Sequence, residues 1–391
     1  MTPPKSSKKS QKNKENNDDM IVTPWEVSGK MDYEKLVKKF GTTLLTNKEI
    51  KQLKEYADGE LHIMLRRQLF FSHRDFDWLL KRYEKGKPFV LYTGRGPSGH
   101  THIGHIVPWI FTKWLQDIFD IELYFQFTDD EKYLFDQDKD FKTTKNFAYE
   151  NAKDVLAIGF DPEKTHFIFD SQLTKTMYQI AVRVAKRVTF STARAVFGFT
   201  NETNIGMIFY PAIQAMPCFL PTELKGEKIP VLIPAAIDQD PYWRITRDVA
   251  EKLGYFKPTA IHCKFFPGLG EGGKMSASQP NTCIYTTDTP KKARSKIMKA
   301  FTGGRETVEE QRKLGGEPEK CIVYQYEYYL FEPDDAEVQK MWNDCKAGKL
   351  LCGQCKKKLA GEVEVFLKEH QAKREQFTKE MIDDLIIKCK D

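Results

Sequence analysis

The chain has 391 residues, of which 40% are hydrophobic and 13% aromatic, so it can bury a sizeable core and is not disordered throughout. No apolar run approaches the roughly 18 residues of a membrane-spanning helix, and the first residues hold no apolar segment of a secretory signal. The 61 basic and 55 acidic residues leave a net charge of +6, which permits a phosphate-rich partner but does not require one. At roughly 150 residues per domain, this length predicts two to three domains. Without a membrane span or a secretory signal, we expect the protein to be cytoplasmic.

The N-terminal part divides into two segments of different composition. Residues 1–20 are rich in lysine and almost without large apolar side chains, so we predict a disordered basic tail. Helical patterns dominate residues 21–86, which we predict to be an N-terminal extension. Within it, Ser72-His73-Arg74-Asp75 has the form of a capping box, which predicts that a helix starts there.

Strand patterns alternate with helical patterns over residues 87–287, which is typical of a mostly parallel sheet. The predicted strands are Phe89–Thr93, Ile121–Thr128, Thr165–Phe169, Ile229–Ala235 and Ala260–Phe266. Strand patterns then vanish, and charged amphipathic helices are predicted over residues 288–391. The predicted fold is a Rossmann-like α/β domain followed by a helical C-terminal domain.

A first candidate site follows the strand at Phe89–Thr93, where a glycine-rich turn leads into an amphipathic helix. His102 and His105 fall in the first turn of this helix, away from the centre of its apolar stripe. Free backbone N–H groups and the positive end of the helix dipole favour anions at the same place. Gly104 between the histidines lets a flat ligand approach the backbone closely. The segment therefore predicts an anion-binding site.

The same turn offers an alternative interpretation. Residues 94–99, GRGPSG, match the G-x-G-x-x-G pattern of dinucleotide-binding proteins. That pattern expects an acidic residue about 20 positions later, whereas Asp129 comes 30 residues after Gly99. The alternative also gives the histidines no role. An NAD-dependent dehydrogenase therefore remains a weaker alternative.

A second candidate site is the glycine-rich loop that follows the last predicted strand, between Pro267 and Pro280. It carries Lys274 and Ser276, and its backbone N–H groups can surround an anion when the loop closes. A lysine on such a loop can stabilise charge that develops only in a transition state.

Together these two sites resemble the signatures of the class I aminoacyl-tRNA synthetases, H-x-G-H and K-M-S-x-S. They stand here as residues 102–105, HIGH, and residues 274–278, KMSAS. Within that class, the stretches YTGRGPSG, FTDDEKYLF, YPAIQAMP and AIDQDPYWRITRDVA resemble the tryptophanyl-tRNA synthetases of eukaryotic type. The resemblance implies activation of tryptophan by ATP to an adenylate and its transfer to the 3′-terminal ribose of tRNA(Trp), by a homodimer.

The resemblance also implies roles for particular residues. His102 and His105 would donate hydrogen bonds to phosphate oxygens, and Lys274 would bind the departing pyrophosphate, with Mg²⁺ bridging it. The catalytic residues it implies are His102, His105, Lys274 and Ser276. The ATP-binding residues it implies are Arg95, Gly96, His102, Gly104, His105, Lys274, Met275 and Ser276.

An indole pocket needs apolar walls and a buried acceptor for the single indole N–H. The residues that the resemblance assigns to it are Tyr92, Gln126, Glu131, Gln214, Gln239 and Trp243. Independent support comes from the strand Ile121–Thr128, where Gln126 alternates with Phe125 and Phe127 and so points away from them. Spacing does not decide which residue accepts the indole N–H.

The resemblance implies that the helical C-terminal segment binds the anticodon of the tRNA. It also implies that Arg305 and Glu306 contact the anticodon bases. Without the resemblance, an ordinary solvated helix start is equally compatible with these residues. Residues 24–27, PWEV, resemble a small flap over the ATP. Cys352-Gly353-Gln354-Cys355 has no second pair of ligands nearby in sequence, so we expect no structural metal.

Two further alternatives stay open. A tyrosyl-tRNA synthetase would share the chemistry but needs a polar pair for the substrate hydroxyl. A non-catalytic tRNA-binding relative would be expected to have lost the signatures that are present here.

Overall fold

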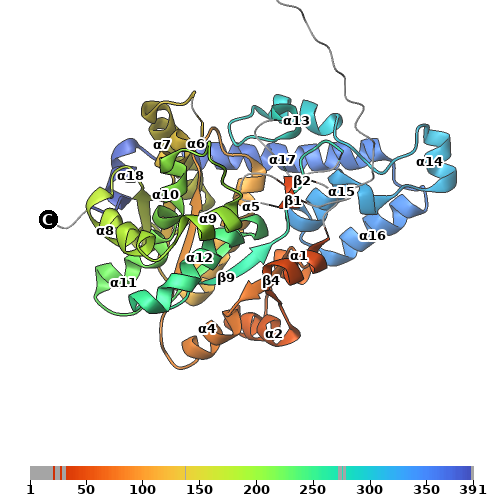
Figure 1. Ribbon diagram of the computed structural model, residues 1–391. Helices are drawn as coiled ribbons and strands as arrows, with labels where there is room; N and C mark the ends of the chain where they lie inside the picture. Colours follow the sequence, from red (N-terminus) through yellow and green to blue (C-terminus); the bar gives the residue numbers. More distant parts are fainter. Residues whose placement is uncertain are drawn as a thin grey trace, which may run out of the picture.

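The structure is a computed structural model that describes residues 21–22, 27–28, 32–136, 138–271, 275 and 279–388 (Figure 1). The predicted tail 1–20, residues 24–26 of the predicted flap, Lys274 and Ser276 lie outside the described residues.

A seven-stranded sheet in the order β3-β4-β9-β8-β5-β6-β7 forms the centre of the molecule. From β9 to β7 the strands are parallel, whereas β3 and β4 join this edge antiparallel. The strands are β3 (Thr43–Leu44), β4 (Phe70–Arg74), β5 (Val90–Arg95), β6 (Leu123–Phe127), β7 (Thr165–Phe169), β8 (Val231–Ala236) and β9 (Thr259–Cys263). A separate antiparallel pair consists of β1 (Ile21–Val22) and β2 (Val27–Ser28).

The chain reverses its direction of progress across the sheet between β5 and β8. It runs from β5 outward to β6 and β7, and then returns to the other side of β5 to form β8 and β9. In open α/β sheets, ligands bind beyond the carboxyl ends of the strands at such a switch point. The topology therefore confirms the predicted Rossmann-like sheet and indicates where a site can form.

The five strands predicted for the parallel part of the sheet are confirmed, but β4 (Phe70–Arg74) was missed. The predicted capping box is wrong, because Ser72 is buried inside β4 and lies 3.2 Å from Nδ1 of His262. The following helix begins after Asp75, and Nδ1 of His73 accepts a hydrogen bond from the Phe76 N–H. Pairing of β4 with β9 outweighs the local helix-start signal.

Helices cover the sheet on both faces (Figure 1). Short helices surround β3 and β4: α1 (Tyr33–Phe40), α2 (Asn47–Tyr56), α3 (Ile63–Arg66) and α4 (Phe76–Tyr83). The parallel strands are connected by α5 (Ile103–Phe119), α6 (Asp129–Phe135), α7 (Phe141–Ile158), α8 (Thr174–Ala185), α9 (Phe190–Phe197), α10 (Ile205–Gln214), α11 (Leu220–Lys225) and α12 (Asp240–Ala250). None of the described helices is both long and apolar enough to cross a membrane.

Alternation along the strands divides the core between the two faces of the sheet. Phe125 and Phe127 of β6 are buried in one hydrophobic cluster with side chains of α5 and α7. Tyr124 and Tyr92 are buried in the other cluster, with side chains of α8, α10 and α12. Gln126 follows Tyr124 by two residues, so it shares this second face, as predicted.

The C-terminal segment is helical, as predicted. It consists of α13 (Pro290–Met298), α14 (Val308–Leu314), α15 (Ile322–Tyr326), a π-helical turn η7 (Glu327–Phe331), α16 (Asp335–Lys346), α17 (Cys352–Arg374) and α18 (Lys379–Leu385). The long helix α17 packs against both α13 and α7, and so joins this segment to the α/β part. In Figure 1, α14 and α16 lie at the opposite side of the molecule from α8 and α11.

Candidate active site

A cavity of about 290 Å³ opens beyond the carboxyl ends of β5 and β8, at the switch point of the sheet. Every described residue that the sequence assigned to ATP or tryptophan lines this crevice: Tyr92, Arg95, Gly96, His102, Gly104, His105, Gln126, Glu131, Gln214, Gln239, Trp243 and Met275. Segments separated by more than a hundred residues therefore meet in one place.

The two histidines lie side by side at the N-terminus of α5. His102 is the N-cap with an extended backbone, and its N–H donates to Nδ1 of His105 at 3.2 Å. Their rings stack with centroids 3.4 Å apart and an interplanar angle of 24°. His102 is buried and His105 half-buried. The two imidazoles therefore lie side by side at a helix start, where backbone N–H groups favour anions, and the predicted anion-binding role stays a prediction.

The late glycine-rich loop meets the same helix start. The backbone N–H of Gly104 lies 3.4 Å from Sδ of the buried Met275. A Cβ atom on residue 104 would lie 3.2 Å from the His102 ring and 3.3 Å from Cβ of Met275, so glycine suits this close contact. The roles predicted for Lys274 and Ser276, which lie outside the described residues, stay predictions.

The segment after the loop also pairs with the segment before α5. The N–H of Ile103 donates to the carbonyl of Ile284 at 3.0 Å, and the N–H of Thr286 donates to the carbonyl of Thr101 at 3.0 Å. These backbone bonds hold the segment after the loop against the start of α5.

Arg95 ends β5 and lines the same crevice as the two histidines. Its Nε and Nη2 atoms are buried and have no hydrogen-bond partner among the described residues, while Nη1 donates to the Gly96 carbonyl. Burial lowers the pKa of Arg95 to about 10, so it stays protonated at neutral pH. Buried guanidinium donors without protein acceptors suit a phosphate group.

The other end of the crevice holds a network of amides and phenols. The Tyr92 hydroxyl donates to Oε1 of Gln126 at 2.6 Å, and Nε2 of Gln214 lies 3.0 Å from the same oxygen and 2.6 Å from the Tyr92 hydroxyl. The hydroxyl of Tyr210 donates in turn to Oε1 of Gln214. Gln126 is fully buried, so these bonds determine its orientation.

Asp170, which was not predicted from the sequence, fixes the orientation of the Gln126 amide. Nε2 of Gln126 donates to both carboxylate oxygens of Asp170, at 2.9 and 2.8 Å. Burial raises the pKa of Asp170 well above its usual range, and the neighbouring Asp130 raises it further. Burial and the charge of Asp129 raise the pKa of Asp130 to about 7. Asp170 comes just after the strand Thr165–Phe169, and this position is the sequence signal that could have identified it.

Trp243 and Glu131 complete this end of the crevice. The Trp243 ring meets the Tyr92 ring edge to face, with centroids 5.4 Å apart, and provides an apolar wall. Glu131 accepts a hydrogen bond from the Thr128 hydroxyl at 3.0 Å and pairs with Nζ of Lys132 at 2.8 Å. Gln239 is half-buried and also lines the crevice.

A family model decides the relationship of the chain. The model described as tRNA synthetases class I (W and Y) matches residues 84–368. The chain belongs to this family. Membership rules out the dinucleotide-binding alternative for the GRGPSG turn.

Similar proteins cover almost the whole chain. The tryptophan–tRNA ligase of Pyrobaculum aerophilum is 55% identical over 359 residues, which are 92% of this chain and 95% of that protein. The tryptophan–tRNA ligase of Thermococcus sibiricus is 56% identical over 362 residues, 92% of each. The prediction of a eukaryotic type stays a prediction, since these relatives are archaeal.

Solved structures show the same fold. The tryptophanyl-tRNA synthetase of Giardia lamblia superposes with a TM-score of 0.85 at 38% identity, covering 91% of this chain and 96% of that one. The enzyme of Aeropyrum pernix superposes with a TM-score of 0.83 at 32% identity, covering 92% and 97%.

The residues assigned to the anticodon lie outside the crevice of this class I synthetase. Arg305 and Glu306 are exposed in the segment before α14. The backbone N–H of Arg305 donates to Oε1 of Gln311, and its Nε donates to the Gly315 carbonyl, each at 2.9 Å. The loop that carries them is therefore held by its own contacts.

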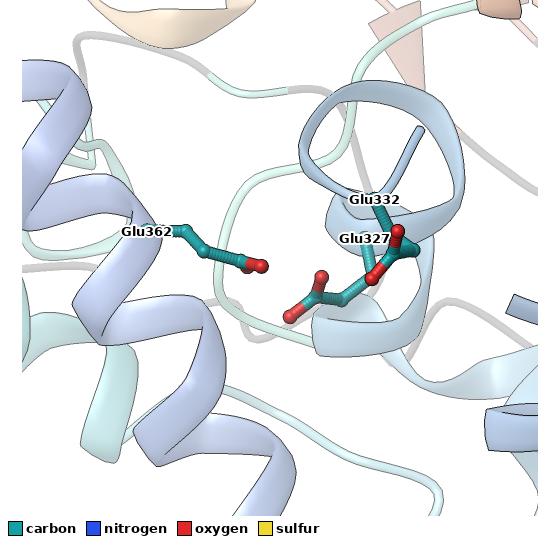
Figure 2. A group of neighbouring side chains, drawn as sticks. All are labelled: Glu327, Glu332 and Glu362. Carbon is teal, nitrogen blue, oxygen red and sulfur yellow. The ribbon is translucent and has the colours of Figure 1, made fainter. Parts of the chain in front are cut away.

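Three glutamates of the C-terminal segment have the spacing of a metal site. Figure 2 shows Glu327, Glu332 and Glu362 gathered between η7 and α17. One carboxylate oxygen of each lies within 4.8 Å of those of the other two. Nζ of Lys358 lies 2.7, 3.1 and 2.6 Å from these three carboxylates, in the same order. The ammonium therefore contacts all three carboxylates, where a metal ion would otherwise bind, and we assign no metal to the cluster.

We expect Lys358→Met to destabilise the protein by about 2 kcal/mol, less than the roughly 3–5 kcal/mol typical of a broken buried pair because Lys358 is partly exposed. Burial first, and then the charge of Glu362, raise the pKa of Glu327 from 4.5 to about 8. The folded chain thus holds a proton that the unfolded chain loses between these pH values, so stability falls as the pH rises through them. Urea unfolding should show a larger loss at pH 8 than at pH 5. An equal loss of stability at the two pH values would contradict this account. Lys340→Met, at an exposed position of α16, is the control.

Proposed function

We propose that this protein is a tryptophan–tRNA ligase. It activates tryptophan with ATP to tryptophanyl-adenylate and pyrophosphate, and then transfers the tryptophanyl group to the 3′-terminal adenosine of tRNA(Trp). The observation that carries the proposal is the single crevice that joins a basic, anion-binding end to a buried amide–phenol end. The relatives over 92% of the chain support the same reaction.

In this proposal His102 and His105 hold the triphosphate at the start of α5, together with the unpartnered donors of Arg95. Gly96 and Gly104 leave room for the nucleotide beside the backbone. The tryptophan carboxylate attacks the α-phosphorus, a new P–O bond forms, and the bond to the pyrophosphate oxygen breaks. The reaction needs positioning and charge stabilisation more than a protein nucleophile.

The late loop would supply the remaining charge. We place Lys274 beside the leaving pyrophosphate, with Ser276 and Met275 on the same loop, because Met275 already contacts the first signature at Gly104. Mg²⁺ commonly binds through substrate phosphates and one or two carboxylates. The crevice offers Asp238 and the lysine-paired Glu131, so the triphosphate would provide most of its ligands, and the ion would neutralise pyrophosphate charge.

The indole would lie between Tyr92 and Trp243, with its N–H directed at Oε1 of Gln126. Asp170 holds the donor side of the Gln126 amide, which leaves the carbonyl as the acceptor. The indole N–H would replace one of the two donors that now share this oxygen. Glu131, Gln214 and Gln239 would complete the pocket.

For the tRNA, we propose that residues 288–391 form an anticodon-binding domain that uses the exposed Arg305 and Glu306. The remaining boundaries, an extension over 21–86 and a catalytic domain over 87–287, also stay proposals. So do the homodimer and the cytoplasmic location.

The alternative amino acid is tyrosine, because the family model covers both enzymes. We expect tryptophan, and not tyrosine, to stimulate exchange of labelled pyrophosphate into ATP. Exchange stimulated by tyrosine alone would favour the alternative, and exchange with neither amino acid would reject the activity.

A further inference from the structure

A buried ion pair joins β4 to the start of α12. Nε of Arg74 lies 2.6 Å from Oδ1 of Asp240, and Nη2 of Arg74 lies 2.7 Å from Oδ2. The Asp240 side chain is fully buried, and the Arg74 side chain is only 12% exposed. Two parallel bonds from a planar guanidinium fix the orientation of a carboxylate as well as its distance. The pair therefore determines how the first turn of α12 lies against β4.

Further contacts hold both partners of this pair. Arg74 donates from Nη1 to the Gly41 carbonyl at 3.1 Å and from Nη2 to the Phe40 carbonyl at 2.5 Å, at the end of α1. Nε2 of the buried His262 in β9 lies 3.4 Å from Oδ1 of Asp240. Burial by itself raises the pKa of Asp240, but the contacts with Arg74 and His262 outweigh burial and lower this pKa to about 2. Asp240 is therefore ionised at neutral pH, and the pair stays charged.

Asp240 does not line the crevice, but residues on both sides of it do. Gln239 directly precedes Asp240, Trp243 follows it by three residues, and both line the crevice. Residues three apart on a helix lie on the same face, so Asp240 and Trp243 leave the same turn of backbone. The Trp243 ring in turn meets the Tyr92 ring edge to face. Fixing Asp240 thus fixes the backbone from which two residues of the proposed tryptophan pocket project.

A second ion pair joins the same two parts of the chain away from the crevice. Nη2 of Arg247 lies 2.5 Å from Oδ2 of Asp75. Asp75 directly follows Arg74, and Arg247 lies seven residues, about two helical turns, after Asp240. Neither Asp75 nor Arg247 lines the crevice, and the Asp75 side chain is 49% exposed. The chain therefore contains a matched pair of links, of which one lies next to the crevice and the other does not.

We propose that Arg74 and Asp240 are positioning residues for the tryptophan pocket. Their ion pair holds the first turn of α12 in the arrangement in which Gln239 and Trp243 bind the amino acid, while Arg74 and Asp240 themselves touch no substrate. The N-terminal extension thereby contributes to tryptophan binding through Arg74. The inference rests on the proposed function for the identity of the amino acid.

An ion pair that only stabilised the fold would behave differently. Weakening it would lower the fraction of folded chain, which affects the use of tryptophan and of ATP alike. A positioning pair acts on Gln239 and Trp243, whereas the residues proposed to bind ATP come from β5, α5 and the late loop. Separate values of KM for the two substrates therefore distinguish the two roles.

The test is Arg74→Lys in the full-length chain. Lysine keeps the positive charge but is a point charge that cannot bind both carboxylate oxygens in one plane. In tryptophan-dependent exchange of labelled pyrophosphate, we expect the KM for tryptophan to rise about fivefold or more, while kcat and the KM for ATP change less than about twofold. Arg247→Lys is the control, and all three values should stay within about twofold of the parent chain.

Three results would overturn the positioning role. They are an unchanged KM for tryptophan in folded Arg74→Lys, a parallel rise in the KM for ATP, and an equal rise in the KM for tryptophan in Arg247→Lys. If the parent chain shows no exchange with tryptophan, the proposed function fails and the inference falls with it. Normal exchange by the parent chain with unchanged values for Arg74→Lys rejects the inference alone.

A second measurement covers the case in which Arg74→Lys does not fold, as judged by circular dichroism. Asp240→Asn keeps the size of the side chain and removes its charge. Equilibrium dialysis with labelled tryptophan, without ATP, then measures binding directly. We expect binding about fivefold or more weaker than that of the parent chain. Binding as strong as that of the parent chain would overturn the proposal.

Discussion

His105→Ala is expected to slow tryptophan-dependent pyrophosphate exchange by roughly 10²–10³-fold, the effect of losing one donor to a transition-state oxyanion. The physical reason is the position of His105 at the start of α5, where it stacks on His102 and lines the crevice. Its half-buried ring contributes little to the core, so the thermal unfolding temperature should change by only a few degrees. Exchange rates at saturating ATP and tryptophan measure the effect.

The matched control is His100→Ala, three residues outside the helix. His100 is exposed, does not line the crevice, and contacts the Phe147 ring edge to face. We expect its exchange rate to stay within about twofold of the parent chain. Equal rates for the two variants would remove His105 from the mechanism.

Gln126→Leu is expected to raise the KM for tryptophan and to lower kcat/KM by roughly 10²-fold, because it removes a buried acceptor that the pocket is built around. The change also leaves the Tyr92 hydroxyl, Nε2 of Gln214 and the Asp170 carboxyl without their shared partner. Such losses cost about 1–3 kcal/mol each, so stability should fall as well. Exchange kinetics over a range of tryptophan concentrations separate binding from stability.

Gln116→Leu provides the comparison for stability. Gln116 is also a buried glutamine, in α5, and its Oε1 accepts a hydrogen bond from the Asp161 N–H at 3.0 Å away from the crevice. We expect a similar loss of stability with an unchanged KM for tryptophan. If both variants shifted KM alike, the effect at Gln126 would be one of general destabilisation and not of the pocket.

Local patterns were sufficient for the parallel half of the fold and for much of the site. Alternation placed Gln126 on the face opposite Phe125 and Phe127, and the position of His102 and His105 followed from helical spacing after a glycine turn. Both inferences depend only on residues close together in the chain, where strand and helix periods determine which side chains share a face.

Other features were not predicted from the sequence because the residues that they contact are distant along the chain. The local pattern at residues 72–75 predicts a helix start, whereas pairing with the distant strand β9 makes Phe70–Arg74 a strand, β4. Asp170 acquires its role only when β7 lies next to β6 and brings its carboxylate to the Gln126 amide. The position of Asp170 just after a predicted strand marks it as a candidate site residue, but no nearby pattern shows that Gln126 is its partner.

By itself the sequence determined the alternation of strands and helices, the two signature segments and the residue types available to bind phosphate and indole, because these follow from short-range periodicity and chemistry. Only the tertiary structure decided that Met275 lies against Gly104, that Asp170 holds Gln126, and that Arg74 pairs with Asp240. Contacts of this kind form when sheet pairing and helix packing close long loops of chain, and they depend on the whole core at once.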